Sequence, residues 1–99
     1  MRAVNNLNLE RLRGLPALEV LASMAEHMKL DRDFVPVRSA GTSRVHVSAN
    51  GQDWELLVDG PKFFDTRASK GGGGAVDLVM HLWGVPFKKA VKMLVEAGA

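Results

Sequence analysis

The chain contains no cysteine among its 99 residues, so neither a disulfide nor a thiolate metal site can form and packing alone must hold the fold. Long apolar runs are absent too, because no segment approaches the roughly 18 residues of a membrane-spanning helix. The start, residues 1–6, has no apolar stretch like that of a signal peptide. We therefore expect a cytoplasmic protein that makes no contact with a membrane.

Residue patterns that carry catalysis are also missing. The histidines His27, His46 and His81 lack the spacing of a zinc site, and no Ser-His-Asp order or close carboxylate pair occurs. The run Gly71–Gly74 follows Ser69 and Lys70, which reverses the order of a nucleotide-binding Walker loop. We predict that the chain is not an enzyme and needs no metal or cofactor.

The composition is that of one globular domain. Apolar residues make up 46% of the chain, and a chain of 99 residues buries roughly two thirds of its unfolded surface. The formal net charge is +2, but residues 1–61 carry seven Lys and Arg against eight Asp and Glu, whereas residues 62–99 carry six against three. The basic excess therefore lies in residues 62–99, although such an excess is also common on ordinary solvated helices.

Apolar spacing predicts an α+β domain. Helical spacing runs over residues 16–30, and residues 7–12 form a short lead-in that is either helical or extended. Strands are predicted at residues 45–48, 54–58 and 62–65, joined by turns at Asn50-Gly51 and Asp59-Gly60-Pro61. Two helices then follow, at residues 75–83 and from Phe87 towards Gly98. We predict a three-stranded antiparallel sheet with one helix before it and two helices after it, in a domain of residues 16–99 preceded by a lead-in of residues 1–15.

Residues 63–80 carry a family resemblance. They read FFDTRASKGGGGAVDLVM, which leads from an aromatic strand through a glycine loop into an apolar helix. The segment resembles the zinc ribbon of bacterial primases of the DnaG type, in which an aromatic strand enters a Cys-x-x-Cys knuckle before a glycine-containing loop and a helix reading Ala-Ile-Asp-Phe-Leu-Met. On that register the knuckle cysteines fall on Thr66 and Ser69, and the earlier Cys-Pro-x-His element falls on residues 35–38. Every metal ligand of the family is therefore absent.

The resemblance implies a zinc-ribbon-like fold without metal, and a non-catalytic module that binds single-stranded DNA or RNA. It also implies a place in the replication or priming machinery of a phage, plasmid or other mobile element, with a primase, helicase or polymerase as a protein partner. A second hypothesis is a protein-interaction module that docks a replication partner or a second copy of itself.

The adjacent rings of Phe63 and Phe64 must point to opposite faces of their strand, so only one can enter the core. The second ring is either covered by the amino-terminal helix, which we favour, or free to stack on an unpaired base. Around it, a basic strip is expected, so the predicted nucleic-acid contacts are Arg44, His46, Lys62, Phe64, Arg67 and Lys70. The glycine loop, Gly71, Gly72, Gly73 and Gly74, is either a tight turn that lets the helix dock, which we favour, or a phosphate-contacting loop. Its four glycines indicate either a positive φ angle or a close approach of the backbone to a neighbour.

Overall fold

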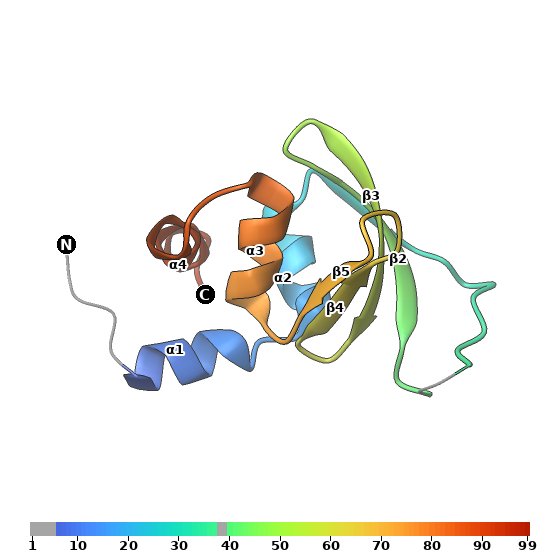
Figure 1. Cartoon of the computed structure of the whole chain (residues 1–99), viewed down its shortest axis with the longest axis horizontal. Helices are drawn as coiled ribbons and strands as arrows, with labels where there is room; N and C mark the ends of the chain where they lie inside the picture. The colour runs from blue at the N-terminus through green and yellow to red at the C-terminus, as the bar shows by residue number, and fades with distance from the viewer. Residues whose placement is uncertain (1–5, 38–39) are drawn as a thin grey trace.

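The computed structural model describes residues 6–37 and 40–99 of the chain. A sheet lies on one side of the molecule and the helices on the other, with α2 and α3 against the sheet and α4 farthest from it (Figure 1). In chain order the elements are α1 (Asn6–Arg13), α2 (Ala17–Met24), β1 (His27–Leu30), β2 (Ser43–Ala49), β3 (Gln52–Asp59), β4 (Lys62–Asp65), β5 (Lys70–Gly72), α3 (Ala75–Trp83) and α4 (Phe87–Glu96).

The sheet has five antiparallel strands, and each strand pairs with its neighbours in sequence. Strands β2 and β3 meet at Asn50 and Gly51, whose φ angles of 52° and 71° are those of the two-residue turn that suits a twisted hairpin. The predicted succession of β2, β3 and β4 is confirmed, including the turn at Gly60, which has a φ of 56°.

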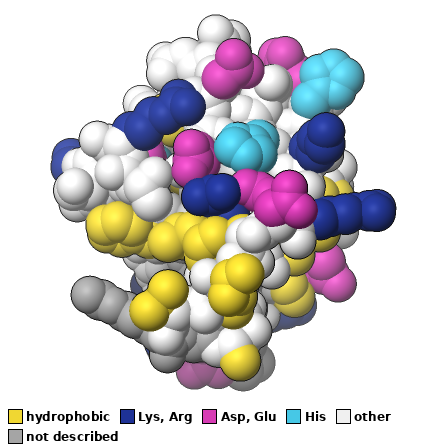
Figure 2. All heavy atoms as spheres, turned by 90° about the vertical axis from the view of Figure 1, so that its right-hand side faces the viewer, with side chains coloured by type: hydrophobic (Ala, Val, Ile, Leu, Met, Phe, Trp, Pro, Cys, Tyr) yellow, Lys and Arg dark blue, Asp and Glu magenta, His cyan; other side chains and the backbone are white. Residues whose placement is uncertain are grey.

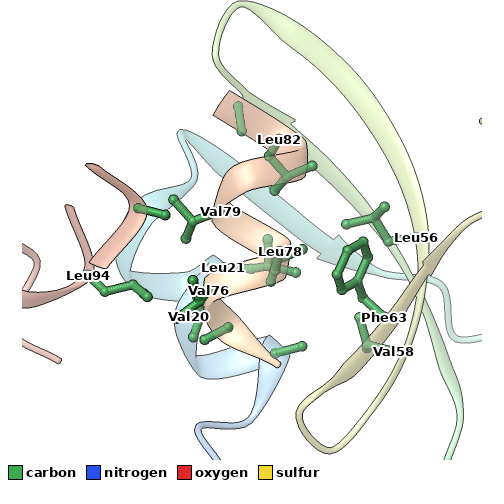
Figure 3. Close-up of a cluster of buried hydrophobic side chains, with 14 of the residues drawn as sticks. Val20, Leu21, Leu56, Val58, Phe63, Val76, Leu78, Val79, Leu82 and Leu94 are labelled. Atoms are coloured by element: carbon green, nitrogen blue, oxygen red, sulfur yellow. The ribbon is translucent and has the colours of Figure 1, made fainter. Parts of the chain in front are cut away.

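The core lies between the inner face of the sheet and helices α2 and α3 (Figure 3). Alternate residues of the central strands point into it, and they meet the apolar faces of both helices. Helix α1 adds Leu12, which is fully buried, and α4 adds Ala90, Val91 and Leu94. These residues form one core: Leu12, Ala17, Val20, Leu21, Val45, Val47, Ala49, Leu56, Val58, Phe63, Ala75, Val76, Leu78, Val79, Leu82, Ala90, Val91 and Leu94.

The prediction of a single helix over residues 16–30 was wrong. Helix α2 ends at Met24 because Ala25 is extended, with φ −77° and ψ 152°, and Glu26 donates its backbone N–H to the carbonyl of Ser48 at 2.8 Å. Residues His27–Leu30 then pair with β2 as an edge strand. The apolar spacing of this segment fits a helix as well as a strand, and pairing with a distant strand decides between them.

The prediction of three strands was also wrong at the other edge of the sheet. Residues Lys70–Gly72, expected in a loop, pair with β4 as strand β5, with Gly72 opposite Phe63 and Gly71 opposite Phe64. Glycine has little intrinsic preference for strands, so the backbone hydrogen bonds to β4 hold this short strand in place. With β1 and β5 the sheet has five strands instead of three.

Two helices precede the sheet, not one, because residues 6–13 are helical as α1. The two helices predicted after the sheet are confirmed as α3 and α4, and Gly84 between them is left-handed, with a φ of 62°. None of the helices in residues 6–37 and 40–99 is long and apolar enough to cross a membrane.

Candidate nucleic-acid interface

The outer face of the sheet, turned away from the helices, carries most of the predicted contact residues. Strand alternation places Arg44 and His46 of β2 and Lys62 and Phe64 of β4 on this face, because their neighbours in sequence are buried. Figure 2 shows this side of the molecule: hydrophobic side chains gather in its lower part, and charged side chains of both signs cross its middle.

Phe64 is 43% exposed on the outer face, whereas Phe63 is buried at 5%. The expectation that the amino-terminal helix covers the second ring was therefore wrong, since α1 and α2 lie on the opposite face of the sheet (Figure 1). Phe64 stands opposite Leu57 on β3 and Gly71 on β5. A Cβ added to Gly71 would lie 3.0 Å from Phe64 Cδ1, so the bare glycine leaves room for the ring.

Phe64 borders a hollow of the outer face with a volume of about 750 Å³. Most of its wall is apolar, with Phe34 and Val37 from the segment after β1 and Leu57 from β3, while Lys62 and Asp59 lie at its polar end. Val37 is 94% exposed. The hollow offers a wide apolar surface with a cation beside it, which suits a flat aromatic group or an apolar side chain.

Arg44 lies on the outer face, but its charge is already paired. Its Nε lies 2.9 Å from Asp31 Oδ2 and 3.8 Å from Glu55 Oε1, and its guanidinium lies 5.2 Å from the ring centroid of Phe34. The hydrogen bond from Arg44 and the backbone N–H of Asp33 lower the pKa of Asp31. Arg44 therefore fastens the segment after β1 to the sheet and has little charge left for a phosphate.

His46 and Arg67 also lie near carboxylates. The His46 Nε2 atom is 3.9 Å from Asp31 Oδ2, and Arg67 Nη2 is 4.0 Å from Glu55 Oε2. Both side chains are well exposed, at 50% and 65%, so these contacts are weak and screened by salt. The predicted basic strip is thus a mixed strip, in which Lys62 is a cation without an ion pair in the described part of the chain.

Lys70 lies away from Phe64. It stands opposite Asp65 on β4, whose side chain faces inward, so Lys70 lies on the α3 side of the sheet edge. There it lines a second, open hollow of about 600 Å³ together with Asp77, Met80 and His81. The structure therefore separates Lys70 from the other predicted contacts.

The four glycines allow close contacts between the backbone and its neighbours. None of Gly71–Gly74 has a positive φ. A Cβ on Gly72 would meet Asp77 Cβ at 2.6 Å, and one on Gly74 would meet the backbone of Arg13 at 3.0 Å, whereas Gly73 has open space around it. Gly71 and Gly72 belong to β5, so the first half of the run that we predicted as a turn or a phosphate-contacting loop is a strand. Residue 72 is therefore a glycine because α3 docks closely on the sheet there, and residue 74 is a glycine because the end of α1 lies close to its backbone.

A buried carboxylate that we did not single out from the sequence organises the edge of the sheet. Asp65 is 3% exposed, and its Oδ2 lies 2.7 Å from His81 Nε2 on α3. Its Oδ1 accepts the backbone N–H groups of Arg67 and Ala68 at 3.0 and 3.2 Å. Burial raises the pKa of Asp65, but the hydrogen bonds from His81 and the two N–H groups outweigh it and lower the pKa. An aspartate that starts a turn is the sequence signal that could have revealed it.

Among the residues that the structure describes, Asp65 and His81 are each other's side-chain partners, and no nucleophile is bonded to the pair. The His81 ring packs against Phe63 and Trp54, with centroids 5.7 and 5.5 Å away. Within residues 6–37 and 40–99 no group of three or more His, Asp or Glu side chains is placed to hold a metal ion. These contacts indicate a structural link between β4 and α3.

Comparisons with known proteins give one partial match. A segment of 43 residues, 43% of the chain, is 44% identical to part of the 65 kDa protein of Zymomonas mobilis subsp. mobilis. This stretch covers 7% of that protein's length. No family model matches the chain, and no solved structure does.

Proposed function

We propose that this domain is a non-catalytic, cytoplasmic module that binds single-stranded DNA or RNA on the outer face of its sheet. The observation that carries the proposal is the exposed ring of Phe64, which borders an apolar hollow beside Lys62. Exposed aromatic rings on a sheet stack on unpaired bases, and a neighbouring cation contacts the phosphate that follows. The resemblance to primase zinc ribbons supplies the replication context.

The binding footprint is smaller than the sequence suggests. Phe64 provides the stacking surface, with Leu57 and Phe34 as apolar neighbours in the hollow, and Lys62 and the exposed end of Arg67 supply positive charge. Arg44 holds the segment after β1 in place and makes no phosphate contact, because Asp31 and Glu55 already lie beside it. A footprint with so few free cations predicts modest affinity and a shallow salt dependence.

A second candidate function is the docking of an apolar protein segment in the same hollow. The ion pairs on this face favour it, since Asp31 and Glu55 lie beside Arg44 and leave little positive charge for a phosphate, whereas an apolar side chain needs no cation. Val37, at 94% exposure, adds apolar surface that a protein partner would cover.

Titration of a labelled single-stranded oligonucleotide at two salt concentrations separates the two functions. If bases stack on Phe64, then Phe64→Ala should weaken binding by about 1–3 kcal/mol, or roughly 5- to 150-fold, with little change in the salt slope. Lys62→Ala should reduce the slope by about 0.7. Val95→Ala, which removes an apolar side chain 52% exposed on α4, is the matched control and should have no effect. If the wild-type domain does not bind the single-stranded oligonucleotide at low salt, this proposal is refuted and protein docking is favoured.

A further inference from the structure

Helix α4 is the outermost element on the side of the molecule opposite the sheet. In Figure 1 it is seen nearly end-on while α3 lies in the plane of the view, so the two helices cross steeply. They are joined by a short turn of Gly84, Val85 and Pro86, and Gly84 is left-handed. Two helices that cross steeply over a short glycine-containing turn have the arrangement of a helix-turn-helix, in which the second helix is free to enter a groove of duplex DNA.

The free face of α4 is positively charged. Ala90, Val91 and Leu94 face the core, while Lys88, Lys89 and Lys92 are exposed on the other side. No carboxylate in the described part of the chain forms an ion pair with these three lysines, which we call the α4 lysine face. Glu96, one turn beyond Lys92, limits this face to the first two turns of the helix.

The position of two of these lysines is unfavourable for the helix itself. Lys88 and Lys89 lie in the first turn, where the helix dipole is positive and acidic residues are preferred. That turn contains no acidic residue, and the preceding Pro86 provides no side-chain cap. Lys88 and Lys92, four residues apart, also repel each other. A charge arrangement that works against folding at several positions indicates a role in binding an anion.

We propose that the α4 lysine face binds the phosphate backbone of duplex DNA. An α-helix fits the major groove of B-form DNA, and the α4 lysine face would contact phosphates at the groove's rim. Residues 87–96 include no Arg, Asn or Gln, the side chains that read base edges most often, so this binding is independent of sequence. The surface is separate from the outer sheet face, and the inference does not depend on single-strand binding there.

The test is a titration of two 20-base-pair DNA duplexes of unrelated sequence at 50 and 200 mM salt. Three phosphate contacts give a salt slope of about −2.7, so wild-type affinity should fall roughly 40-fold over this range. The two duplexes should bind within about twofold of each other, since lysine contacts to phosphate carry no sequence information.

The triple variant Lys88→Gln, Lys89→Gln and Lys92→Gln should lose most of the salt dependence and bind at least about tenfold more weakly at 50 mM salt. The matched control changes Lys29, Lys62 and Lys70 to Gln, which alters the net charge equally on the sheet, and should retain the slope. Gln keeps the helix intact, so the α4 variant should melt no lower than the wild type. The proposal would be overturned if both triple variants lost duplex affinity equally, or if the wild type did not bind duplex at 50 mM salt. Phe64→Ala should leave duplex binding unchanged, so a failure of single-strand binding would be seen separately.

Discussion

Replacement of Gly72 by alanine tests how the sheet edge and α3 fit together. Gly72 lies in β5, opposite Phe63, and the first turn of α3 approaches it from the other side. An alanine Cβ there would lie 2.6 Å from Asp77 Cβ and 2.7 Å from Phe63 Cε1. Carbon atoms pack best at about 3.5–4.0 Å, so each neighbour must move by roughly 1 Å.

Neither neighbour can move easily. Asp77 Cβ is attached directly to the backbone of α3, and Phe63 is a core ring with 5% exposure. Overpacking of this kind costs about 1–3 kcal/mol in the free energy of unfolding, against a gain of only about 0.4–1 kcal/mol from the stiffer unfolded chain. Gly73→Ala is the matched control, because a Cβ at Gly73 meets nothing within 4 Å and its φ is not positive.

Thermal and urea unfolding, followed by circular dichroism, would measure the difference. Gly72→Ala should lower the melting temperature by roughly 4–8 °C for each kcal/mol lost, and Gly73→Ala should leave it unchanged or raise it slightly. Equal melting temperatures for the two variants would refute the close packing of β5 against α3 and would make the glycine run a simple spacer.

Three further predictions concern the absence of a zinc requirement, the buried carboxylate of Asp65 and the role of Arg44 on the outer face. With no cysteine in the chain, the melting temperature should be the same with and without a chelator, and stoichiometric zinc by elemental analysis would contradict this. Because the pKa of Asp65 is lowered on folding, its stabilisation is present above the usual carboxylate pKa and lost as pH falls through the folded value. Asp65→Asn should therefore flatten the decline of melting temperature between about pH 5 and pH 2, and an unchanged pH profile would count against the Asp65 contacts. Arg44→Ala should leave the salt slope of single-strand binding unchanged, since its charge is already paired. A slope reduced as much as by Lys62→Ala would show that Arg44 contacts phosphate.

The elements predicted correctly from the sequence are those specified by local signals. The Asn50-Gly51 turn fixes the β2–β3 hairpin, and Gly84 ends α3 through its left-handed conformation. The elements that were missed depend on distant partners. The segment His27–Leu30 becomes a strand only because β2 pairs with it, and Lys70–Gly72 only because β4 does.

In the candidate site, too, features set by local sequence could be predicted and those set by distant partners could not. Strand alternation correctly separates Phe63 from Phe64, since it depends only on the period of the strand. The neutralisation of Arg44 by Asp31 could not be predicted, because the two residues are 13 positions apart and meet through the pairing of β1 with β2. The Asp65–His81 contact likewise joins a strand to a helix 16 residues later.

The turn between β4 and β5, residues 66–69, lies where the resemblance places the zinc knuckle of primases. Here a single carboxylate holds it: Asp65 accepts two backbone N–H groups of the turn and reaches His81 on α3 with its other oxygen. A knuckle held by thiolates and zinc opens when the metal is chelated or the thiols are oxidised. A turn held by a carboxylate is insensitive to chelation and to oxidation. Protonation of Asp65 would weaken its hydrogen bonds instead, so low pH is the condition that should loosen this edge of the domain.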